Sequence, residues 1–416
     1  MTESFYLGPG NTRFAPSSFQ DVVAAAESGL LNEGHWVELK KAVPPKSPGA
    51  NLELAKDLAS LSVDGGIMVI GIEDKKGAAG AVTGTPIDGL ASRIDATALA
   101  KVHPPLTVVT TILPHADNLD TGVILVNVPA SVSAPHMVDG TYWGRGDEGK
   151  RPLSDVEVRR LLTLEQGRSE KFEKRLYDVA KVIGGEQLQH TGPAFNFLAE
   201  PASTTYGAPV TETLGQGHLL QWFSEAVPHQ AKWSPSLLSL QHRVPHPDGV
   251  SAASFNLSAR SAYYWDQLSV LIGDDGCWYA RGGSAVSPIG SSSDPNDGIA
   301  VFRAGAAIEL THALLISIAH FANNKIPFQG QWTIGVHINQ LSGIEPVEKH
   351  IGRFPGEFSA YPREQYIGKT IATTDEMTSN PAQVTMRLLR RLLRAMSVEH
   401  YYFPYSDFKD IGKGRH

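Results

Sequence analysis

The sequence predicts an α+β protein with two parts, an N-terminal α/β domain and a second α+β domain of unnamed fold. In the first part, short apolar runs typical of strands alternate with amphipathic helical segments. After Gly184-Gly185 the composition changes, and residues 190–260 are rich in Pro, Ser, Thr and aromatic residues. Two strong helical patterns follow, at residues 304–323 and 381–398.

A charged helical segment separates the two parts. Its start is marked by a capping box formed by Ser154 and Glu157, and the helical pattern continues to about residue 183. Because this segment is charged rather than apolar, we expect the first part to be a separable domain. The predicted divisions are residues 1–165 for the first domain, 166–189 for a helical connector and 190–416 for the second domain.

The first part contains a regular series of predicted elements. Residues 19–28 have helical spacing with Ser17 or Ser18 as the cap, and residues 52–61 form a second amphipathic helix. An apolar run bounded by glycines and by Glu73-Asp74 is typical of a buried central strand. Strands are predicted at residues 34–40, 67–72, 106–113, 121–128 and 140–143.

The second part combines a hairpin, a strand and two helices. Segments 269–272 and 278–281 flank a Gly-Asp-Asp-Gly turn and predict a hairpin, and residues 332–339 predict a strand. Residues 287–298 are expected to form a mobile loop. The helix at 381–398 is amphipathic. Its expected inner residues are Met386, Leu389, Leu393 and Met396, and its expected outer residues are Arg387, Arg390, Arg391 and Arg394.

Composition predicts a folded cytoplasmic protein without membrane association. Hydrophobic residues make up 42% of the chain and charged residues 19%, which is ordinary for a globular protein. The single cysteine, Cys277, excludes an intramolecular disulfide and a cysteine-based zinc site. No secretory signal is visible at the N-terminus. The most apolar segment, 306–322, is interrupted by Glu309, His312 and His320 and is expected to be too short and too polar to span a bilayer.

The overall charge limits how this protein could bind nucleic acid. A formal net charge of −7 speaks against a protein that coats nucleic acid through bulk electrostatics. Any such contact is therefore expected to be local, through a basic groove or through metal ions held by carboxylates.

Several short motifs follow one another in the first part. They are EGHWVELK at 33–40, ASLSVDGGIMVIGIED at 59–74, HPP at 103–105 and TYWGRG at 141–146. In this order they resemble the AlbA-like domain of the Schlafen family over residues 18–165. The chain departs from the family pattern at Ser62, where the family usually has Asn, and at Trp143-Gly144. The resemblance implies an α/β fold and a role in nucleic-acid processing.

The resemblance also implies a set of site residues. In Schlafen proteins that cleave tRNA and rRNA, the active site has two glutamates five residues apart and an aspartate after the central strand. The matching positions here are Glu33, Glu38 and Asp74. Three converging carboxylates can bind Mg²⁺ or Mn²⁺ through oxygen, and such an ion can orient water and neutralise a scissile phosphate. The residues expected to contact phosphate are Lys40, Lys41 and Arg145.

Each of these residues also has a simpler structural interpretation. Glu33 could be a turn carboxylate, and Asp74 could begin a turn after a buried strand. Glu38 and Lys40, which share one face of a strand, could form a solvated surface.

Other motifs carry less weight. Residues 144–149 match G-x-G-x-x-G without a surrounding βαβ unit and predict a turn. Residues 368–370 resemble the end of a P-loop, but Arg363 stands where the first glycine is required. The arginine face of segment 381–398 could grip phosphates, but such a face is more often solvated or ion-paired. Residues that could stack on bases or pack in the core are Trp36, Tyr142 and Trp143.

Three functions are compatible with these observations. The first hypothesis is a metal-dependent endoribonuclease acting on structured RNA such as tRNA, in antiphage or stress defence, and it predicts that Glu33 and Glu38 face each other in a cleft. A homodimer could then supply a second lobe, with helix 304–323 or 381–398 at the interface. The alternatives are a non-catalytic DNA- or RNA-binding regulator, with a basic cleft, and a structural subunit of a defence complex, with a large apolar interface.

Overall fold

The computed structural model divides the chain into two compact units. Unit 1 comprises Met1–Ser169 with Ala202–Gly207 and Pro327–Gln331, and unit 2 comprises the other residues. The division at Ser169 falls inside helix α4 (Asp155–Tyr177). The residues that the structure describes are 5–8, 14–146, 149–184, 192–202, 219–227, 232–233, 235–254, 266–289, 298–324, 330–352 and 356–411.

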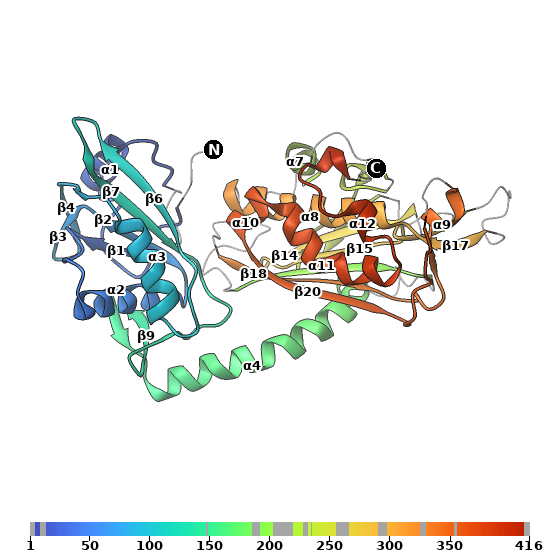
Figure 1. Ribbon diagram of the computed structural model, residues 1–416, viewed down its shortest axis with the longest axis horizontal. Coiled ribbons are helices and arrows are strands. Elements are labelled where there is room, and N and C mark those ends of the chain that lie inside the picture. The colour runs from blue at the N-terminus through green and yellow to red at the C-terminus, as the bar shows by residue number, and fades with distance from the viewer. Residues whose placement is uncertain are drawn as a thin grey trace. The chain divides into compact units, whose positions relative to one another are not determined.

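Unit 1 is built on a five-stranded mixed sheet (Figure 1). Its first two strands are parallel, and the other pairs are antiparallel. The central strand β7 pairs with β2, β5 and β6. The strands are β1 (Val37–Lys40), β2 (Gly66–Ile70), β5 (Thr85–Pro86), β6 (Val109–His115) and β7 (Asn118–Val128).

Helices cover both faces of this sheet. Helices α2 (Pro48–Leu61) and α3 (Leu90–Lys101) pack on the face that carries Met68 and Ile70. Helix α1 (Phe19–Glu27) and the N-terminal segment pack on the opposite face. Because successive side chains of β2 are buried on opposite faces, its sequence is a continuous apolar run rather than an alternating one.

Local sequence signals account for most elements of unit 1. Helix α1 begins at the Ser18 cap, and Ser154 and Glu157 form the capping box at the start of α4, as predicted. The predicted strand 67–72 is instead interrupted at Gly71, whose φ of 114° is a left-handed conformation that favours glycine. The chain leaves the sheet there and continues as a hairpin of β3 (Ile72–Lys75) and β4 (Ala78–Val82).

Some elements of unit 1 differ from the expectation. Helix α2 begins at Pro48, ahead of the predicted start at residue 52, because Ser47 caps the helix and proline is favoured in the first helical turn. Helix α3 was not predicted, although Leu90, Ile94 and Ala98 recur every four residues and are buried; its cap residue Gly89 makes no side-chain hydrogen bond that would mark its start. A smaller sheet contains β8 (Met137–Val138), β9 (Thr141–Gly146) and β10 (Gly149–Pro152).

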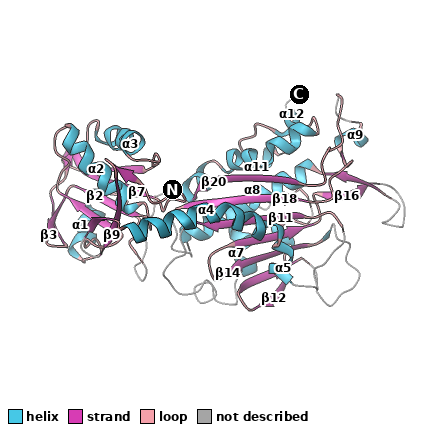
Figure 2. Cartoon of the chain, turned by 90° about the horizontal axis from the view of Figure 1, so that it is seen from below, coloured by secondary structure: helices cyan, strands magenta, loops and turns pink. Residues whose placement is uncertain are grey.

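Unit 2 is built on a seven-stranded sheet (Figure 2). Helix α8 (Ala304–Asn324) lies on one face, where Phe321 contacts Trp278 with ring centroids 5.2 Å apart. Helix α5 (Val179–Gly184) and the end of α4 pack on the opposite face against Tyr279. In sheet order the strands are β12 (His242–His246), β13 (Gly249–Ala253), β14 (Leu268–Gly273), β15 (Trp278–Gly282), β11 (Phe195–Pro201), β18 (Gln331–Ile338) and β20 (Tyr366–Thr373).

The remaining elements of unit 2 are short, apart from helix α11 (Pro381–Ala395), which packs on β20 and α8. A second sheet contains β16 (Val286–Ile289), β17 (Ile299–Phe302) and β19 (Glu345–Pro346). The other helices are α7 (Leu219–Ala226), α9 (Glu348–Ile351), α10 (Thr374–Ser379) and α12 (Glu399–Tyr402), with 3₁₀ turns at Leu237–Ser239 and Phe408–Asp410.

The predicted α+β class is confirmed, and so are the main elements of unit 2. The hairpin β14–β15, helix α8 and strand β18 lie within one or two residues of their predicted bounds. The inner face of α11 contains Leu388 and Leu392, which were not predicted, whereas Met386 is only half-buried. Of the predicted mobile loop, residues 290–297 lie outside the described part of the chain.

The two long helices use their apolar faces inside unit 2. With 21 residues, α8 is long and apolar enough to cross a membrane by length and composition, which corrects the expectation that it is too short. However, 89% of its most apolar window is buried, so it serves as a core helix. The apolar face of α11 is buried as well. The faces predicted to form a dimer interface are therefore occupied within the chain.

The contact between β20 and α11 allows a test of the packing in unit 2. A Cβ atom at Gly368 would lie 2.1 Å from the Leu388 carbonyl oxygen, so the strand and the helix would have to separate. We expect Gly368→Ala to lower the free energy of unfolding by about 1–3 kcal/mol in urea denaturation. The control is Gly49→Ala in α2, where a Cβ meets nothing within 4 Å. Equal stability of the two variants would contradict this account of the packing.

Candidate functional site

The predicted carboxylates meet where β1 lies beside the β3–β4 hairpin. Glu38 and Lys40 project from the same side of β1, as residues two apart on a strand do. Glu33 lies before β1, and its backbone N–H donates to the Gly77 carbonyl of the hairpin at 2.7 Å. Asp74 accepts the Gly77 N–H at 2.7 Å and is exposed. Residues separated by about 40 positions are thus brought to one place.

Glu38 is held by two cations. The Arg145 Nη1 donates to its Oε2 at 2.6 Å, and the Lys40 Nζ donates to its Oε1 at 2.8 Å. Arg145 also donates to the carbonyl oxygens of Gly34 and Val37, at 2.8 and 3.2 Å. The side chain of Arg145 is only 1% exposed. This placement does not fit the prediction that Arg145 contacts phosphate, because its guanidinium anchors β1 from inside the unit.

The ion pairs continue beyond Lys40. The Lys40 Nζ lies 2.8 Å from Asp57 Oδ2, and the Lys150 Nζ lies 2.6 Å from Asp57 Oδ1. Lys150 reaches Glu53 Oε2 at 3.0 Å. We call this series the ion-pair chain, and its members are Arg145, Glu38, Lys40, Asp57, Lys150 and Glu53. Lys40 is therefore a bridge between two buried carboxylates rather than a phosphate ligand in this arrangement.

Asp57 is the member that sequence analysis should have found. Its side chain is 1% exposed, and it lies on the buried face of α2 between Leu54 and Leu58. A carboxylate within the apolar stripe of a helix requires a cation or hydrogen-bond donors, because burying an uncompensated charge is costly. The irregular stripe was therefore a usable signal, although it does not identify Lys40 and Lys150 as the partners.

Glu33 and Glu38 have opposite electrostatic environments. Burial is the main cause that raises the pKa of Glu33 to about 7. The adjacent Glu38 carboxylate adds to this rise through its charge and a hydrogen bond, and the charge of Asp74 adds to it as well. Burial also acts to raise the pKa of Glu38, but Lys40 and Arg145 outweigh it and hold that pKa below its ordinary value. The site therefore pairs an ionised carboxylate with one that binds a proton near neutral pH.

Three exposed lysines border the carboxylates. Lys41 follows β1, and its side chain is 65% exposed and pairs with Glu73 at 2.7 Å. Lys75 and Lys76 are exposed at the turn of the β3–β4 hairpin. Lys41 and Lys75 both lower the pKa of Glu73, with the Lys41 hydrogen bond as the larger cause, so both lysines lie near Glu73. Three lysines thus share this surface with the carboxylates Glu73 and Asp74.

The other predicted contact residues are largely packed. Trp36 is half-buried and contacts the rings of Tyr6 and His35, with centroids 6.3 and 4.6 Å apart. Trp143 is half-buried beneath Lys56, whose Nζ lies 5.1 Å from the ring centroid. The G-x-G-x-x-G segment joins β9 and β10, which pair in antiparallel register from Gly146 and Gly149 onward.

The carboxylates do not fit a divalent metal ion as they are arranged. Both Glu38 oxygens already accept hydrogen bonds from cationic side chains, and Glu33 shares a hydrogen bond with Glu38. Within the described ranges, no group of three His, Cys, Asp or Glu side chains has the geometry of a metal site. Exposed Asp74 is engaged by the Gly77 N–H. Metal ligation would require Glu33 to lose its proton and Glu38 to exchange its partners.

The raised pKa of Glu33 predicts how unit 1 responds to pH. Below pH 4.5, the ordinary pKa, Glu33 is protonated in both the folded and the unfolded chain. Between 4.5 and about 7 the unfolded chain loses the proton first, so stability falls as pH rises, and above 7 the full penalty remains. We expect Glu33→Gln, which keeps a hydrogen-bond donor, to raise Tm by about 2–4 °C at pH 8 and by less toward pH 5.

The matched control for this measurement is Glu73→Gln. Glu73 lies on the β3–β4 hairpin that Glu33 contacts, but Lys41 lowers its pKa, so neutralising it removes a favourable interaction and should not raise Tm. Differential scanning calorimetry at several pH values compares both variants with the unmodified protein. If Glu33→Gln does not raise Tm at pH 8, the pKa of Glu33 is not raised in the folded protein.

Comparison with known proteins identifies the domain that holds this site. The Schlafen, AlbA_2 family matches residues 33–154, within the wider range that the motifs predicted. No curated protein matches the chain. A solved structure, that of the DIP2311 protein from Corynebacterium diphtheriae, is 20% identical with a TM-score of 0.24, and the match covers 35% of this chain and 29% of that one. The chain therefore carries a Schlafen AlbA-like domain in unit 1, and this family suggests a nucleic-acid-related function.

Proposed function

We propose that unit 1 binds nucleic acid through the surface that carries Lys41, Lys75 and Lys76. The supporting observation is that the basic residues near the carboxylates differ in their partners and exposure. Arg145 and Lys40 are used inside the ion-pair chain, whereas these three lysines are exposed beside the carboxylates. Lysine ammonium groups contact phosphate oxygens as point charges and read no base sequence. The expected ligand is therefore RNA or DNA recognised through its backbone.

The strength of such binding follows from the small number of cations. Each phosphate neutralised by a lysine releases counterions, so the logarithm of the binding constant falls with the logarithm of salt concentration by about 0.9 per contact on duplex DNA and about 0.7 on single strands. With few lysines and a net charge of −7, binding should be weak and should disappear at high salt.

A double substitution tests this surface. We expect Lys75→Ala/Lys76→Ala to weaken binding to a labelled RNA and to a duplex DNA, and to reduce the salt slope by roughly 1.5–2. Fluorescence anisotropy over a range of salt concentrations provides both quantities. The control is Lys101→Ala/Lys181→Ala, which removes the same charge from the end of α3 and from α5. If both double variants lose the same affinity and slope, the hairpin surface is not the binding site.

A second candidate is the metal-dependent endoribonuclease implied by the motifs, acting on structured RNA such as tRNA in stress or antiphage defence. One observation favours it: Glu33 lies close enough to Glu38 and Asp74 to interact electrostatically with both. The Mg²⁺ or Mn²⁺ cofactor, the homodimer and the cytoplasmic location remain predictions. The ion pairs of Glu38 argue against cleavage in the present arrangement, which is why we propose binding first.

Cleavage of tRNA in the presence of Mn²⁺ tests the second candidate. If the enzyme hypothesis is correct, Asp74→Asn abolishes cleavage, whereas Glu73→Gln, at the preceding residue of the same strand, retains it. Glu38→Gln is a poorer test, because it would leave Arg145 buried beside a neutral partner and cost about 3–5 kcal/mol of stability. Equal activity of the two variants would show that Asp74 takes no part in the reaction. If the unmodified protein does not cleave tRNA, the enzyme hypothesis is wrong and only the binding proposal is left.

A further inference from the structure

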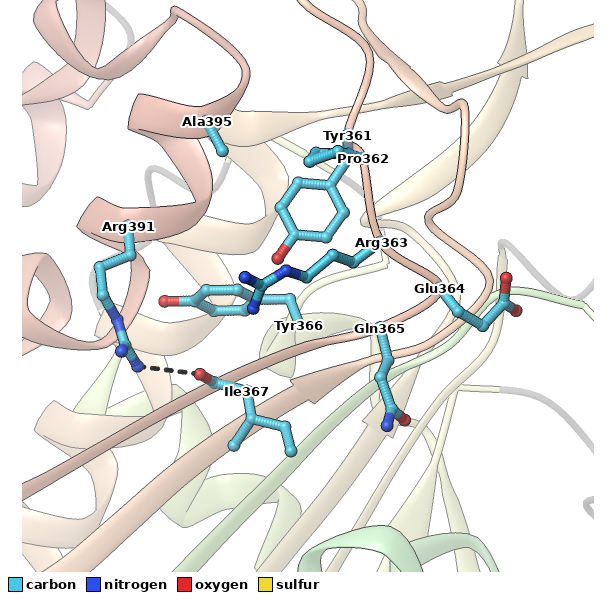
Figure 3. A pocket seen from close by; sticks show the side chains of 9 residues that line it. All are labelled: Tyr361, Pro362, Arg363, Glu364, Gln365, Tyr366, Ile367, Arg391 and Ala395. Carbon is cyan, nitrogen blue, oxygen red and sulfur yellow. Dashed lines mark hydrogen bonds between the residues drawn. The ribbon is translucent and has the colours of Figure 1, made fainter.

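Unit 2 contains an open pocket between the start of β20 and the end of α11 (Figure 3). Its volume is about 620 Å³, which is within the range of small-molecule sites in proteins. Tyr361 and Tyr366 form an aromatic wall, and Arg363 and Arg391 contribute two guanidinium groups. Nothing in unit 1 contributes to this pocket, so it can be assessed independently of the nucleic-acid surface.

The arginines of this pocket differ from their neighbours on α11. Arg387 makes a bidentate pair with Glu376, at 2.5 and 2.9 Å, and Arg390 pairs with Glu399 at 2.5 Å. Arg391 instead donates to the Ile367 carbonyl oxygen at 3.1 Å and also hydrogen-bonds the Tyr366 hydroxyl. Among the side chains that the structure describes, neither Arg391 nor Arg363 has a carboxylate within ion-pair distance. The charges of the two guanidinium groups are therefore not neutralised by a carboxylate in this part of the chain.

The aromatic wall is fixed in place. Tyr366 is buried, and its hydroxyl donates to the Leu388 carbonyl oxygen at 2.5 Å. Tyr361 is 6% exposed and meets Tyr366 edge-on, with ring centroids 6.3 Å apart and an interplanar angle of 84°. Burial raises the pKa of Tyr361, while Arg363 and Arg391 oppose that rise, so both guanidinium groups lie near its hydroxyl. The two charges therefore converge beside one aromatic ring.

The other polar lining residues do not cancel these charges. Glu364 points away from the tyrosines in Figure 3. The Gln365 Oε1 accepts a hydrogen bond from the His337 Nε2 at 3.1 Å. The pocket thus offers two guanidinium forks and a tyrosine hydroxyl as donors next to an apolar wall. Arginine forks suit the planar, bidentate recognition of phosphate oxygens.

We propose that this pocket binds a nucleoside phosphate, with Arg363 and Arg391 on the phosphate and the Tyr361–Tyr366 wall against the organic part. The phosphate carries up to two negative charges and so matches two arginines, and the tyrosine edges offer an apolar surface. The phosphate could belong to a free nucleotide or to the 5′ end of a strand, which have the same chemistry. The experiment must therefore distinguish these two sources.

Isothermal titration calorimetry of the full chain with adenosine 5′-monophosphate tests the proposal. We expect measurable binding of this nucleotide and none of adenosine, and at least a tenfold loss of affinity in Arg363→Gln and Arg391→Gln. The matched control is Arg394→Gln, an exposed arginine of α11 outside the pocket lining, which should bind normally. Because Arg363 makes no ion pair in the described part of the chain, its replacement should leave the fold intact even if Arg391→Gln is destabilised.

Competition experiments identify the source of the phosphate. Displacement of the nucleotide by a 5′-phosphorylated but not a 5′-hydroxyl oligonucleotide supports the proposal and assigns the site to strand ends. Displacement by free nucleotides alone supports it and assigns the site to a small molecule. The proposal is overturned if adenosine 5′-monophosphate does not bind, if adenosine binds equally well, or if Arg363→Gln binds as tightly as Arg394→Gln.

Discussion

The buried ion pair between Arg145 and Glu38 is the interaction on which the architecture of the site depends. It joins residues 107 positions apart. Arg145 also donates hydrogen bonds to the carbonyl oxygens of Gly34, which lies before β1, and Val37, which lies within it. Removing one partner of such a pair typically costs about 3–5 kcal/mol, because the other charge is left buried without compensation. The position of β1, and with it the position of Glu33, follows from this contact.

The same pair determines the charge states around it. Arg145 and Lys40 keep Glu38 ionised despite its burial, and the ionised Glu38 then favours a protonated Glu33. Two neighbouring carboxylates thus have different roles because only one of them has cationic partners. The fold thus brings Glu33, Glu38 and Asp74 together while Glu38 serves as a structural anchor.

The sequence predicted those features that depend on neighbouring residues. The helix caps at Ser18 and Ser154, the apolar run of β2 and helix α8 are local patterns, and the structure contains each of them. The order of the motifs, through the family resemblance, predicted that Glu33, Glu38 and Asp74 lie close together. The partners of Asp57 were not, because the pair with Lys150 joins residues 93 positions apart. The Gly-Lys-Thr sequence at 368–370, which resembles the end of a P-loop, has a packing role in the structure. Gly368 allows β20 to approach α11 closely.

The arginines show why residue type alone does not determine function. Four of them follow one another along α11 and appear equivalent in the sequence. In the structure, α10 places Glu376 opposite Arg387, and α12 places Glu399 opposite Arg390. Arg391 instead contacts the Ile367 carbonyl group and the Tyr366 hydroxyl, which are neutral. An arginine opposite a carboxylate stabilises the fold, and an arginine opposite a neutral wall can bind a ligand. The role of each is therefore set by the short helices that flank α11 in the sequence, and the helical periodicity of α11 alone does not reveal which arginine they pair with.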